Sequence, residues 1–457
     1  MEVAARLPEG ERARPTESPA EAPPRVRASG LAAHVGERVR VMGWLRSMRR
    51  LGAITFLIVR DGWGETQAVA TRPEELAPLT EAGAGVESVV AISGVVADAP
   101  QAPGGVELRE LSIEVITPVR AAPPVTLSKR ELKASMGVLL DHAVVTNRHP
   151  RRRAAFRLAS SAMAGFRATL RAHGFTEVQT PKLVATATEG GANVFEVNYF
   201  DRAAYLAQSP QFYKQVMVGV FERVFEVGPV FRAEPHDTTR HLSEYVSLDA
   251  EFGFIEDHFT VMAMLRDVMA GIFARVAEEC GAELALLSAR APAVPAVIPH
   301  IHFAEAQELI WRLHGVDSRG EPDLAPQEER WLGEWALAEH GSEFLYVTGY
   351  PMAKRPFYTH PDPTRPGYSN SFDLLFRGIE LVTGGQRLHR YEDYLAALAR
   401  ANLSPEPFAW YLEAFRYGMP PEGGWAIGLE RLVSQLIGAP SVKLVTLFPR
   451  DLTRLAP

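Results

Sequence analysis

The chain of 457 residues contains a single cysteine, Cys280. One thiol cannot form an internal disulfide, and it excludes a zinc site built from several thiolates. The sequence around it, EECGAEL, is typical of a helix end. We therefore interpret Cys280 as a small packed residue without a chemical role.

Long apolar runs are also absent. No stretch approaches the roughly 20 apolar residues that a membrane-spanning helix requires. The sequence from Met1 to Gly30 is rich in Pro, Ala, Glu and Arg and lacks the hydrophobic segment of a secretory signal. We expect a cytoplasmic protein without a membrane partner.

The charge balance lacks a basic excess. The formal net charge is −7, which argues against nucleic-acid binding by overall charge, so any RNA must be bound by particular surfaces. Two common phosphate-binding patterns, GxxxxGK followed by Ser or Thr and a GxGxxG directly after a strand, are missing. Their absence argues against the parallel nucleotide-binding folds that carry them.

Length and composition indicate more than one domain. A hydrophobic content of 47% is that of a globular protein, and 457 residues exceed what one ordinary core contains. Residues 1–28 hold too few large apolar groups to fold and are expected to be a disordered extension. From Gly36 to Val119, five β-like runs with one helical insert predict a small barrel, so residues 29–120 are assigned to an OB-fold.

The remainder mixes helices with strands that are not regularly separated by crossover helices. This pattern predicts an α+β fold, an antiparallel sheet flanked by helices, over residues 151–457. The stretch AAPPVTLSKRELKAS marks residues 121–150 as a hinge. Residues 285–345 are expected to be a helical insertion. His300 and His302 within it lack nearby acids, which favours a structural role over a metal site.

Several charged residues lie in a strand–loop–strand pattern over residues 231–255. FEVGPVFRAE and YVSLDAEFGF have the periodicity of β-strands, and HDTTRH connects them. The pattern predicts that one antiparallel pair presents five charged residues: Arg232, Glu234, Arg240, His241 and Asp249. Guanidinium groups suit phosphate oxygens and a carboxylate accepts from amino groups, so the pair is suited to a nucleotide; a purely structural, salt-bridged hairpin is the alternative.

A second stretch, GGWAIGLERLVSQLIGAPSVKLVTLFPRD from Gly423 to Asp451, predicts a glycine-rich strand that runs directly into a helix. Its apolar residues have helical spacing, and Gly438 ends the helix. Glycines allow a ligand to approach the backbone closely, and Arg431 in the first turn can face that ligand.

These two stretches resemble motifs 2 and 3 of class II aminoacyl-tRNA synthetases. A predicted helix from Arg152 to His173, followed by GFTEVQTPKL, resembles motif 1, which ends at Pro181. The resemblance covers nearly the whole chain and is closest to aspartyl-tRNA synthetases of the archaeal and eukaryotic type, through ATATEGG, QSPQFYKQ, FRAEPHDTTRHLSEY, ELVTGGQRLH and GLERL in this order. It implies the class II catalytic fold and an OB-fold that holds the anticodon.

The resemblance implies an ATP site. Arg232 matches the arginine that holds the α-phosphate and Arg431 the one near the γ-phosphate, and both are implied as catalytic. Glu234 matches the carboxylate that reads the adenine amino group, and Tyr245 takes the position of an aromatic that stacks on the base.

The loop over the triphosphate and the metal are implied in the same way. Arg240 and His241 lie on that loop. Glu380 and Thr383 match the ligands of Mg²⁺, and a carboxylate with a hydroxyl is the oxygen set that Mg²⁺ prefers.

An aspartate site is implied as well. Lys214 and Arg387 match the two cations that hold the substrate's side-chain carboxylate, and Glu189, Gln211 and Asp249 match groups that read its α-amino end. Asparagine would leave two buried cations partly unpaired. Asparaginyl enzymes, moreover, do not carry a lysine at the position of Lys214.

The implied function is that of a homodimeric aspartate-tRNA ligase, which activates L-aspartate with ATP and Mg²⁺ and transfers it to tRNA(Asp); whether tRNA(Asn) is also charged stays open. Asparagine-tRNA ligase and a non-ligating, RNA-binding paralogue are the alternatives. Retention of Arg232, Arg431 and Glu380 argues against the paralogue.

On the barrel, five residues are candidates for stacking on unpaired bases or contacting the RNA backbone: Trp44, Arg46, Arg49, Arg50 and Phe56. A place in the barrel core for Phe56 and a merely solvated Arg50 are the open alternatives.

Overall fold

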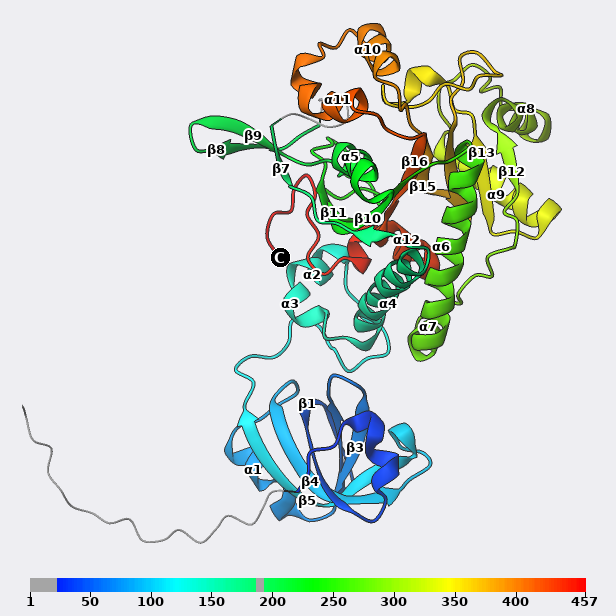
Figure 1. Cartoon of the computed structure of the whole chain (residues 1–457). Helices are drawn as coiled ribbons and strands as arrows, with labels where there is room; N and C mark the ends of the chain where they lie inside the picture. Colours follow the sequence, from blue (N-terminus) through cyan, green and yellow to red (C-terminus); the bar gives the residue numbers. More distant parts are fainter. Residues whose placement is uncertain (1–22, 186–192) are drawn as a thin grey trace, which may run out of the picture. The chain divides into compact units, whose positions relative to one another are not determined.

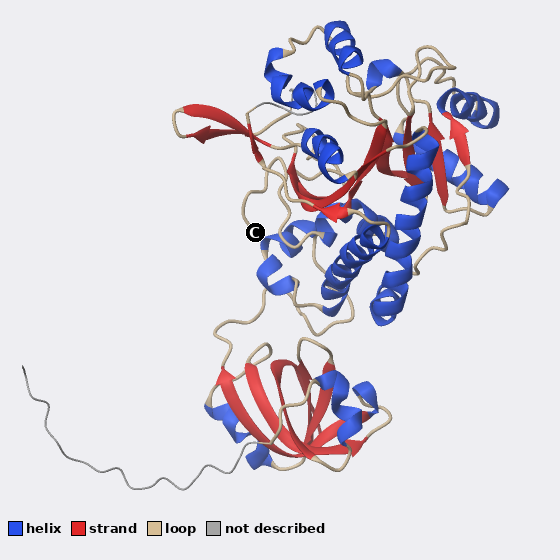
Figure 2. Ribbon diagram, viewed as in Figure 1, coloured by secondary structure: helices blue, strands red, loops and turns tan. Residues whose placement is uncertain are grey.

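The computed structural model describes residues 23–185 and 193–457. The chain divides into two compact units, Met1–Ala134 and Ser135–Pro457 (Figures 1 and 2). The division falls within the stretch expected as a hinge. In the part of the chain that the structure describes, no helix has the length and apolar character to cross a membrane.

The first unit is a closed barrel with the strand order β1-β2-β3-β5-β4. Its strands are β1 (Arg38–Leu51), β2 (Ile54–Arg60), β3 (Glu65–Ala70), β4 (Val89–Asp98) and β5 (Val106–Thr117). Its helical turns are η1 (Ala28–His34), η2 (Pro73–Leu76), α1 (Ala77–Glu81) and η3 (Pro103–Gly105). Five strands and one helical insert agree with the predicted barrel.

Alternate side chains of the barrel strands fill its interior. On β2, Leu57 and Val59 are fully buried in the barrel core, whereas Phe56 between Thr55 and Leu57 is half-buried and outside that core. Phe56 therefore faces outward, which removes one of the two alternatives left open for it.

The second unit is built on an eight-stranded sheet with the order β12-β13-β14-β15-β16-β11-β10-β6. These strands are β6 (Thr176–Glu177), β10 (Arg223–Phe231), β11 (Glu244–Gly253), β12 (His300–His302), β13 (Phe344–Thr348), β14 (Ser371–Phe376), β15 (Ile379–Gln386) and β16 (Glu422–Gly428). Neighbours pair antiparallel except β6 with β10 and β12 with β13. The predicted antiparallel sheet with flanking helices is confirmed.

A small second sheet has the order β7-β9-β8. Its strands are β7 (Leu183–Val184), β8 (Glu196–Tyr199) and β9 (Arg202–Leu206). The helices of the unit are α2 (Met136–Asp141), α3 (Ala143–Thr146), α4 (Pro150–Ala172), α5 (Gln211–Phe221), α6 (His258–Glu279), α7 (Gly281–Leu287), α8 (Phe303–His314), α9 (Pro326–His340), α10 (Tyr391–Arg400), α11 (Ala409–Arg416) and α12 (Leu429–Ile437), with the turns η4 (Met352–Lys354), η5 (Glu406–Phe408) and η6 (Val442–Val445).

Helices α4, α6 and α12 share the main hydrophobic core with one face of the large sheet. On β11, Leu248 and Ala250 point into this core. Because side chains alternate along a strand, Asp249 and Glu251 point to the opposite face. The period-two pattern of this strand thus decides which of its residues are available for chemistry.

Helices α4 and α6 pack closely against each other at two glycines. A Cβ on Gly165 would lie 2.9 Å from the Cα of Ile272, and one on Gly271 would lie 1.9 Å from Oγ1 of Thr169. Cys280, at the end of α6, is 4% exposed, and burial raises the pKa of its thiol. It is a packed residue, as the sequence predicts.

The opposite face of the sheet carries two further apolar clusters. Helices α5, α10 and α11 meet around Phe212, Tyr394 and Tyr411. Helices α8 and α9 pack on β13. The segment expected as a helical insertion contains α8 and α9, but it also contributes β12 and the first two residues of β13 to one end of the sheet (Figure 1).

Candidate active site

A cavity of about 230 Å³ opens on the face of the sheet that bears the polar residues of β11. The loop between β10 and β11 forms one side, and β15, β16 and the first turn of α12 form the other. All eight residues predicted to bind ATP or its metal line this cavity: Arg232, Glu234, Arg240, His241, Tyr245, Glu380, Thr383 and Arg431. Segments far apart in the sequence therefore converge as predicted.

The loop side of the cavity combines a cation, an acid and an aromatic ring. The guanidinium carbon of Arg232 lies 5.6 Å from the ring centroid of Tyr245, and an Arg232 nitrogen lies 3.8 Å from Oε1 of Glu234. An open aromatic face beside a guanidinium suits a nucleotide base with its phosphate.

His241 closes this side. Its Nε2 lies 3.6 Å from Oε2 of Glu234, and its Nδ1 contacts Oγ1 of Thr238 at 2.6 Å. Burial lowers the pKa of His241, and the Glu234 carboxylate offsets part of that effect. A neutral imidazole at neutral pH can therefore be either donor or acceptor here.

The opposite wall holds a paired arginine and acid. Arg431 donates to Oε1 of Glu380 at 3.1 Å and to the carbonyl oxygen of Glu380 at 3.0 Å. Thr383 donates to the same Oε1 at 3.3 Å. Glu380 thus neutralises Arg431 in the absence of a ligand, and both groups remain about one-third exposed to the cavity.

The oxygen set at Glu380 fits a hard divalent cation. A carboxylate and a hydroxyl meet there, and Asp373 faces Thr383 across the β14–β15 pair. Asp373 is held by Arg355 at 3.1 Å; burial raises the pKa of its carboxyl to about 6 and the arginine opposes that shift. Asp373 was not predicted, although an acid within the apolar run SFDLLF is the signal that marks it.

The described residues contain no cluster of three or more His, Cys, Asp or Glu side chains arranged to hold a metal ion. His302 has another role: its Nδ1 accepts from the backbone N–H of Ala304 at 3.2 Å and so caps α8. This supports the structural role inferred for His302.

A buried charge cluster adjoins the cavity along β11. Ser247 lines the cavity and donates to Asp249. Lys214, 1% exposed, places Nζ 2.9 Å from Oδ1 of Asp249 and 3.2 Å from Oε2 of Glu251. Arg387 donates to Oε1 of Glu251 at 2.8 Å. The two cations predicted for a substrate carboxylate are therefore neighbours that share one acid.

Buried acids dominate the electrostatics of this cluster. The pKa of Arg387 is raised, because the attraction of Glu251 outweighs the opposing effect of burial, so the guanidinium stays charged. Glu422 is fully buried; burial and the neighbouring Glu251 raise the pKa of its carboxyl well above its usual range. It accepts from Nε2 of Gln215 at 3.0 Å.

Another predicted aspartate ligand, Gln211, is hydrogen-bonded within its own helix. Gln211, 4% exposed, donates to Oε1 of its helix neighbour Gln215 at 3.0 Å. Glu189 lies outside the described residues. Glu251 and Glu422 were not predicted, yet Glu251 follows Asp249 by two residues in an apolar strand, which is the signal of a second side chain on the same face.

The chain matches two protein-family models. The model for class II tRNA synthetases (D, K and N) matches residues 135–452, and the model for the OB-fold nucleic acid binding domain matches residues 39–116. The second match confirms the predicted OB-fold.

Similar proteins cover almost the entire chain. An aspartate–tRNA(Asp/Asn) ligase of Thermus thermophilus is 44% identical over 95% of this chain and 100% of the relative. One of Deinococcus radiodurans is 45% identical over 93% and 97%. Among solved structures, asparaginyl-tRNA synthetase from Pyrococcus horikoshii complexed with asparaginyl-adenylate superposes with a TM-score of 0.86 at 31% identity, covering 93% of this chain and 97% of that one.

Proposed function

The chain belongs to the class II tRNA synthetases of the aspartate, lysine and asparagine group, and we propose that it is an aspartate-tRNA ligase that uses ATP. One observation carries the proposal: a cavity lined by Arg232, Tyr245, Glu380 and Arg431 adjoins, through Ser247 and Asp249, a buried pair of cations, Lys214 and Arg387. The first set suits a nucleoside triphosphate and the second an acidic amino acid.

In the proposed first step, a carboxylate oxygen of aspartate attacks the α-phosphorus of ATP. The new P–O bond forms as the bond to pyrophosphate breaks, giving aspartyl-adenylate. Arg232, beside Tyr245, is assigned to neutralise charge on the α-phosphate. The Tyr245 ring is assigned to stack on adenine, and Glu234 to accept from the adenine amino group. Positioning and charge neutralisation account for most of the acceleration of such a transfer.

Arg431, Arg240 and His241 are assigned to the far end of the triphosphate. For Arg431 this requires an exchange of partners, because its guanidinium is paired with Glu380. Glu380 and Thr383, with Asp373 nearby, would hold Mg²⁺, which supplies charge neutralisation at the phosphates. With the metal bound, Glu380 would serve as its ligand and Arg431 would be available to the phosphates.

Selectivity for aspartate is assigned to Lys214 and Arg387. Both are desolvated, so an anionic side chain gains two fixed cations as partners beside Asp249 and Glu251, and the neutral amide of asparagine forfeits that attraction. Asp249, with Gln211 and Glu189, is assigned to the α-amino group. The likeness to an asparaginyl enzyme keeps asparagine as the second candidate substrate, and the lysine at position 214 favours aspartate.

In the second step, a terminal ribose hydroxyl of tRNA attacks the acyl carbon of aspartyl-adenylate and AMP leaves. We assign the anticodon to the outer face of the barrel. Phe56 faces outward, and Arg49, its partner across β1 and β2, is exposed on the same face. Arg50 is exposed but pairs with Thr55 on the other face of the two strands, Arg46 pairs with Glu65, and Trp44 lies against Arg60. Both compared ligases are named for tRNA(Asp) and tRNA(Asn), so we propose these two tRNAs as substrates. A cytoplasmic homodimer joined through α4 and the segment after it completes the proposal.

Pyrophosphate exchange measured with each of the twenty amino acids tests the first step. Exchange with aspartate well above exchange with asparagine is expected. Charging of tRNA(Asp) and tRNA(Asn) transcripts then tests the second step. Exchange that depends on asparagine alone, or no exchange with any amino acid, would refute the assignment.

A further inference from the structure

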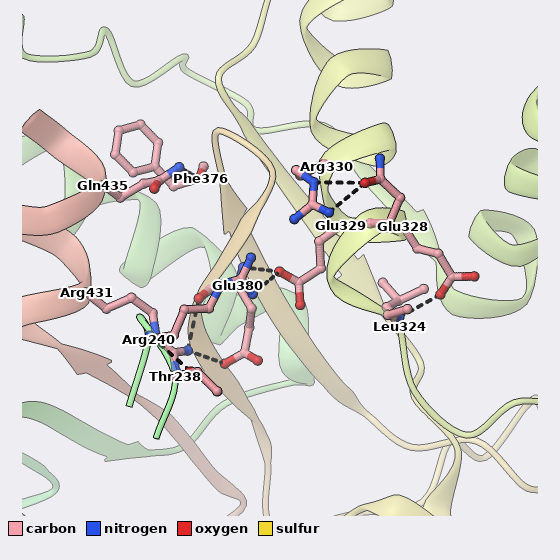
Figure 3. Close-up of polar contacts among 12 residues, drawn as sticks. Thr238, Arg240, Leu324, Glu328, Glu329, Arg330, Phe376, Glu380, Arg431 and Gln435 are labelled. Atoms are coloured by element: carbon pink, nitrogen blue, oxygen red, sulfur yellow. Dashed lines mark hydrogen bonds and ion pairs between the residues drawn. The ribbon is translucent and has the colours of Figure 1, made fainter. Parts of the chain in front are cut away.

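Glu329 on helix α9 lies beside the proposed ATP site without belonging to any of the three motifs. Its side chain is directed toward β15 and the loop between β10 and β11, whereas its neighbour Glu328 is directed to the other side of the helix (Figure 3). Glu329 is 7% exposed. A carboxylate this well buried requires partners, because an unpaired buried charge is costly.

Two groups of the site provide those partners. Nη1 of Arg240 lies 3.2 Å from Oε2 of Glu329, and the backbone N–H of Glu380 donates to the same oxygen at 3.1 Å (Figure 3). One carboxylate oxygen therefore joins the loop that covers the triphosphate to the strand that carries the proposed metal ligand.

The position of Glu329 is fixed by a close backbone contact between α9 and the β14–β15 turn. A Cβ on Gly333 would lie 2.5 Å from the Cα of Gly378, and one on Gly378 would lie 2.8 Å from the Cα of Arg330. The turn is held in place from the other side, where Nε2 of Gln435 donates to the carbonyl oxygen of Phe376 at 3.0 Å. Glu329 is thus presented from a rigid support.

We propose that Glu329 is a positioning residue for Arg240, a role that rests on the proposed function. A guanidinium has five N–H donors, and among the described residues the hydrogen bonds of the Arg240 side chain are confined to Nη1 and Glu329. The remaining donors can face the cavity that Arg240 lines. Glu329 holds one side of the guanidinium so that the other side meets the terminal phosphates without first being ordered.

The competing physical role is a restraint, in which Glu329 withholds Arg240 from ATP. Both roles use the same contact but predict opposite effects on ATP affinity. A third role, support of the β15 backbone through the N–H of Glu380, does not need the negative charge. Glu329→Gln distinguishes all three, because an amide oxygen still accepts from that N–H while the attraction to Arg240 is largely lost.

The test compares the full-length wild type with Glu329→Gln, Arg240→Ala and the double variant. In exchange assays with aspartate, Glu329→Gln is expected to raise the KM for ATP roughly five- to tenfold, with kcat and the KM for aspartate within about twofold. Arg240→Ala should raise the KM for ATP at least as much as Glu329→Gln does. The double variant should match Arg240→Ala, because the two residues act through one contact.

Glu328→Gln is the matched control. Glu328 is an equally buried acid on the same helix turn, but it accepts from the backbone N–H of Ala325 at 2.7 Å and caps α9. Glu328→Gln should lower the melting temperature and leave the KM for ATP unchanged. If Glu329→Gln melts far below the wild type, Glu329→Asp replaces it in the test, because aspartate keeps the charge and has a shorter side chain. Glu329→Asp is expected to raise the KM for ATP less than Glu329→Gln does.

Calorimetric Kd values for Mg-ATP repeat the comparison without turnover, which separates this inference from the proposed function. A wild type that binds ATP but exchanges no amino acid would refute the function, and the Kd of Glu329→Gln would still decide the inference. An unchanged or lowered Kd in that variant, or effects of Glu329→Gln and Arg240→Ala that simply add, would overturn the positioning role. Failure of the wild type to bind ATP would overturn both.

Discussion

Replacing Lys214 with methionine tests the buried cations most directly. Methionine keeps much of the length of the lysine side chain and removes its charge. In the ligand-free chain Lys214 and Arg387 balance Asp249 and Glu251. The variant leaves two buried acids with one cation, so an entering aspartate carboxylate meets a net negative cluster.

The size of the effect follows from this geometry. Truncating one partner of a buried, hydrogen-bonded charge pair costs about 2–5 kcal/mol in binding, which corresponds to roughly 30- to 4,000-fold. Stability should also fall, because breaking a buried ion pair costs about 3–5 kcal/mol. The KM for ATP should change little, since the groups assigned to ATP line the cavity and Lys214 does not.

The assay is pyrophosphate exchange with aspartate and with asparagine, below the melting temperature of each variant. We expect aspartate activation to drop steeply and the preference over asparagine to narrow. Arg60→Met is the control, because Arg60 lies 3.1 Å from the buried Glu87 within the barrel, so the substitution should cost stability but not selectivity. An unchanged aspartate preference in Lys214→Met, or an equal loss of that preference in Arg60→Met, would refute the reasoning.

Three further predictions concern ATP, tRNA and pH. Arg232→Ala and Arg431→Ala should each reduce exchange about 100-fold or more with little change in melting temperature, since both side chains are about one-third exposed; near-normal rates in both would contradict the ATP assignment. Removal of residues 1–134 should preserve exchange within about threefold and abolish tRNA charging, and equal loss of both would mean that the catalytic unit needs the barrel. Burial raises the pKa of Glu430 to about 7, so between pH 4.5 and 7 the folded chain retains a proton that the unfolded chain releases. Relative to Glu430→Gln, the free energy of unfolding of the wild type should therefore fall by up to about 3 kcal/mol as the pH rises from 4.5 to above 7. Parallel pH profiles of the two proteins would contradict this prediction.

The directions of side chains on the apolar strands could be predicted, because successive residues of a strand point to opposite faces of the sheet. The run YVSLDAEFGF fixes the face of Asp249 once Leu248 and Ala250 are known to be core. The convergence of Arg232 and Arg431, 199 positions apart in the printed sequence, came instead from the family resemblance, since no spacing rule reports a long-range distance.

Other features depend on pairings that the sequence does not disclose. The partners of Lys214 are two acids of the chain itself, and a substrate carboxylate therefore joins an existing network. Strand β12 has three residues and pairs in parallel with a strand about 45 positions later, so a segment expected to be helical also extends the sheet. Glu329 reads as an ordinary first-turn acid, and only the contact between Gly333 and Gly378 brings it to the site.

The order in which the strands are synthesised differs from their order in space. Strand β16 is the last in the chain, yet it lies between β15 and β11, near the middle of the sheet. Until the ribosome has produced it, the strands on its two sides form separate halves, each with an unpaired edge. Such edges invite pairing between nascent chains. Tyr245 and Glu380 stand on opposite sides of this gap, so a chain that terminates before residue 422 has no nucleotide pocket and is prone to aggregate.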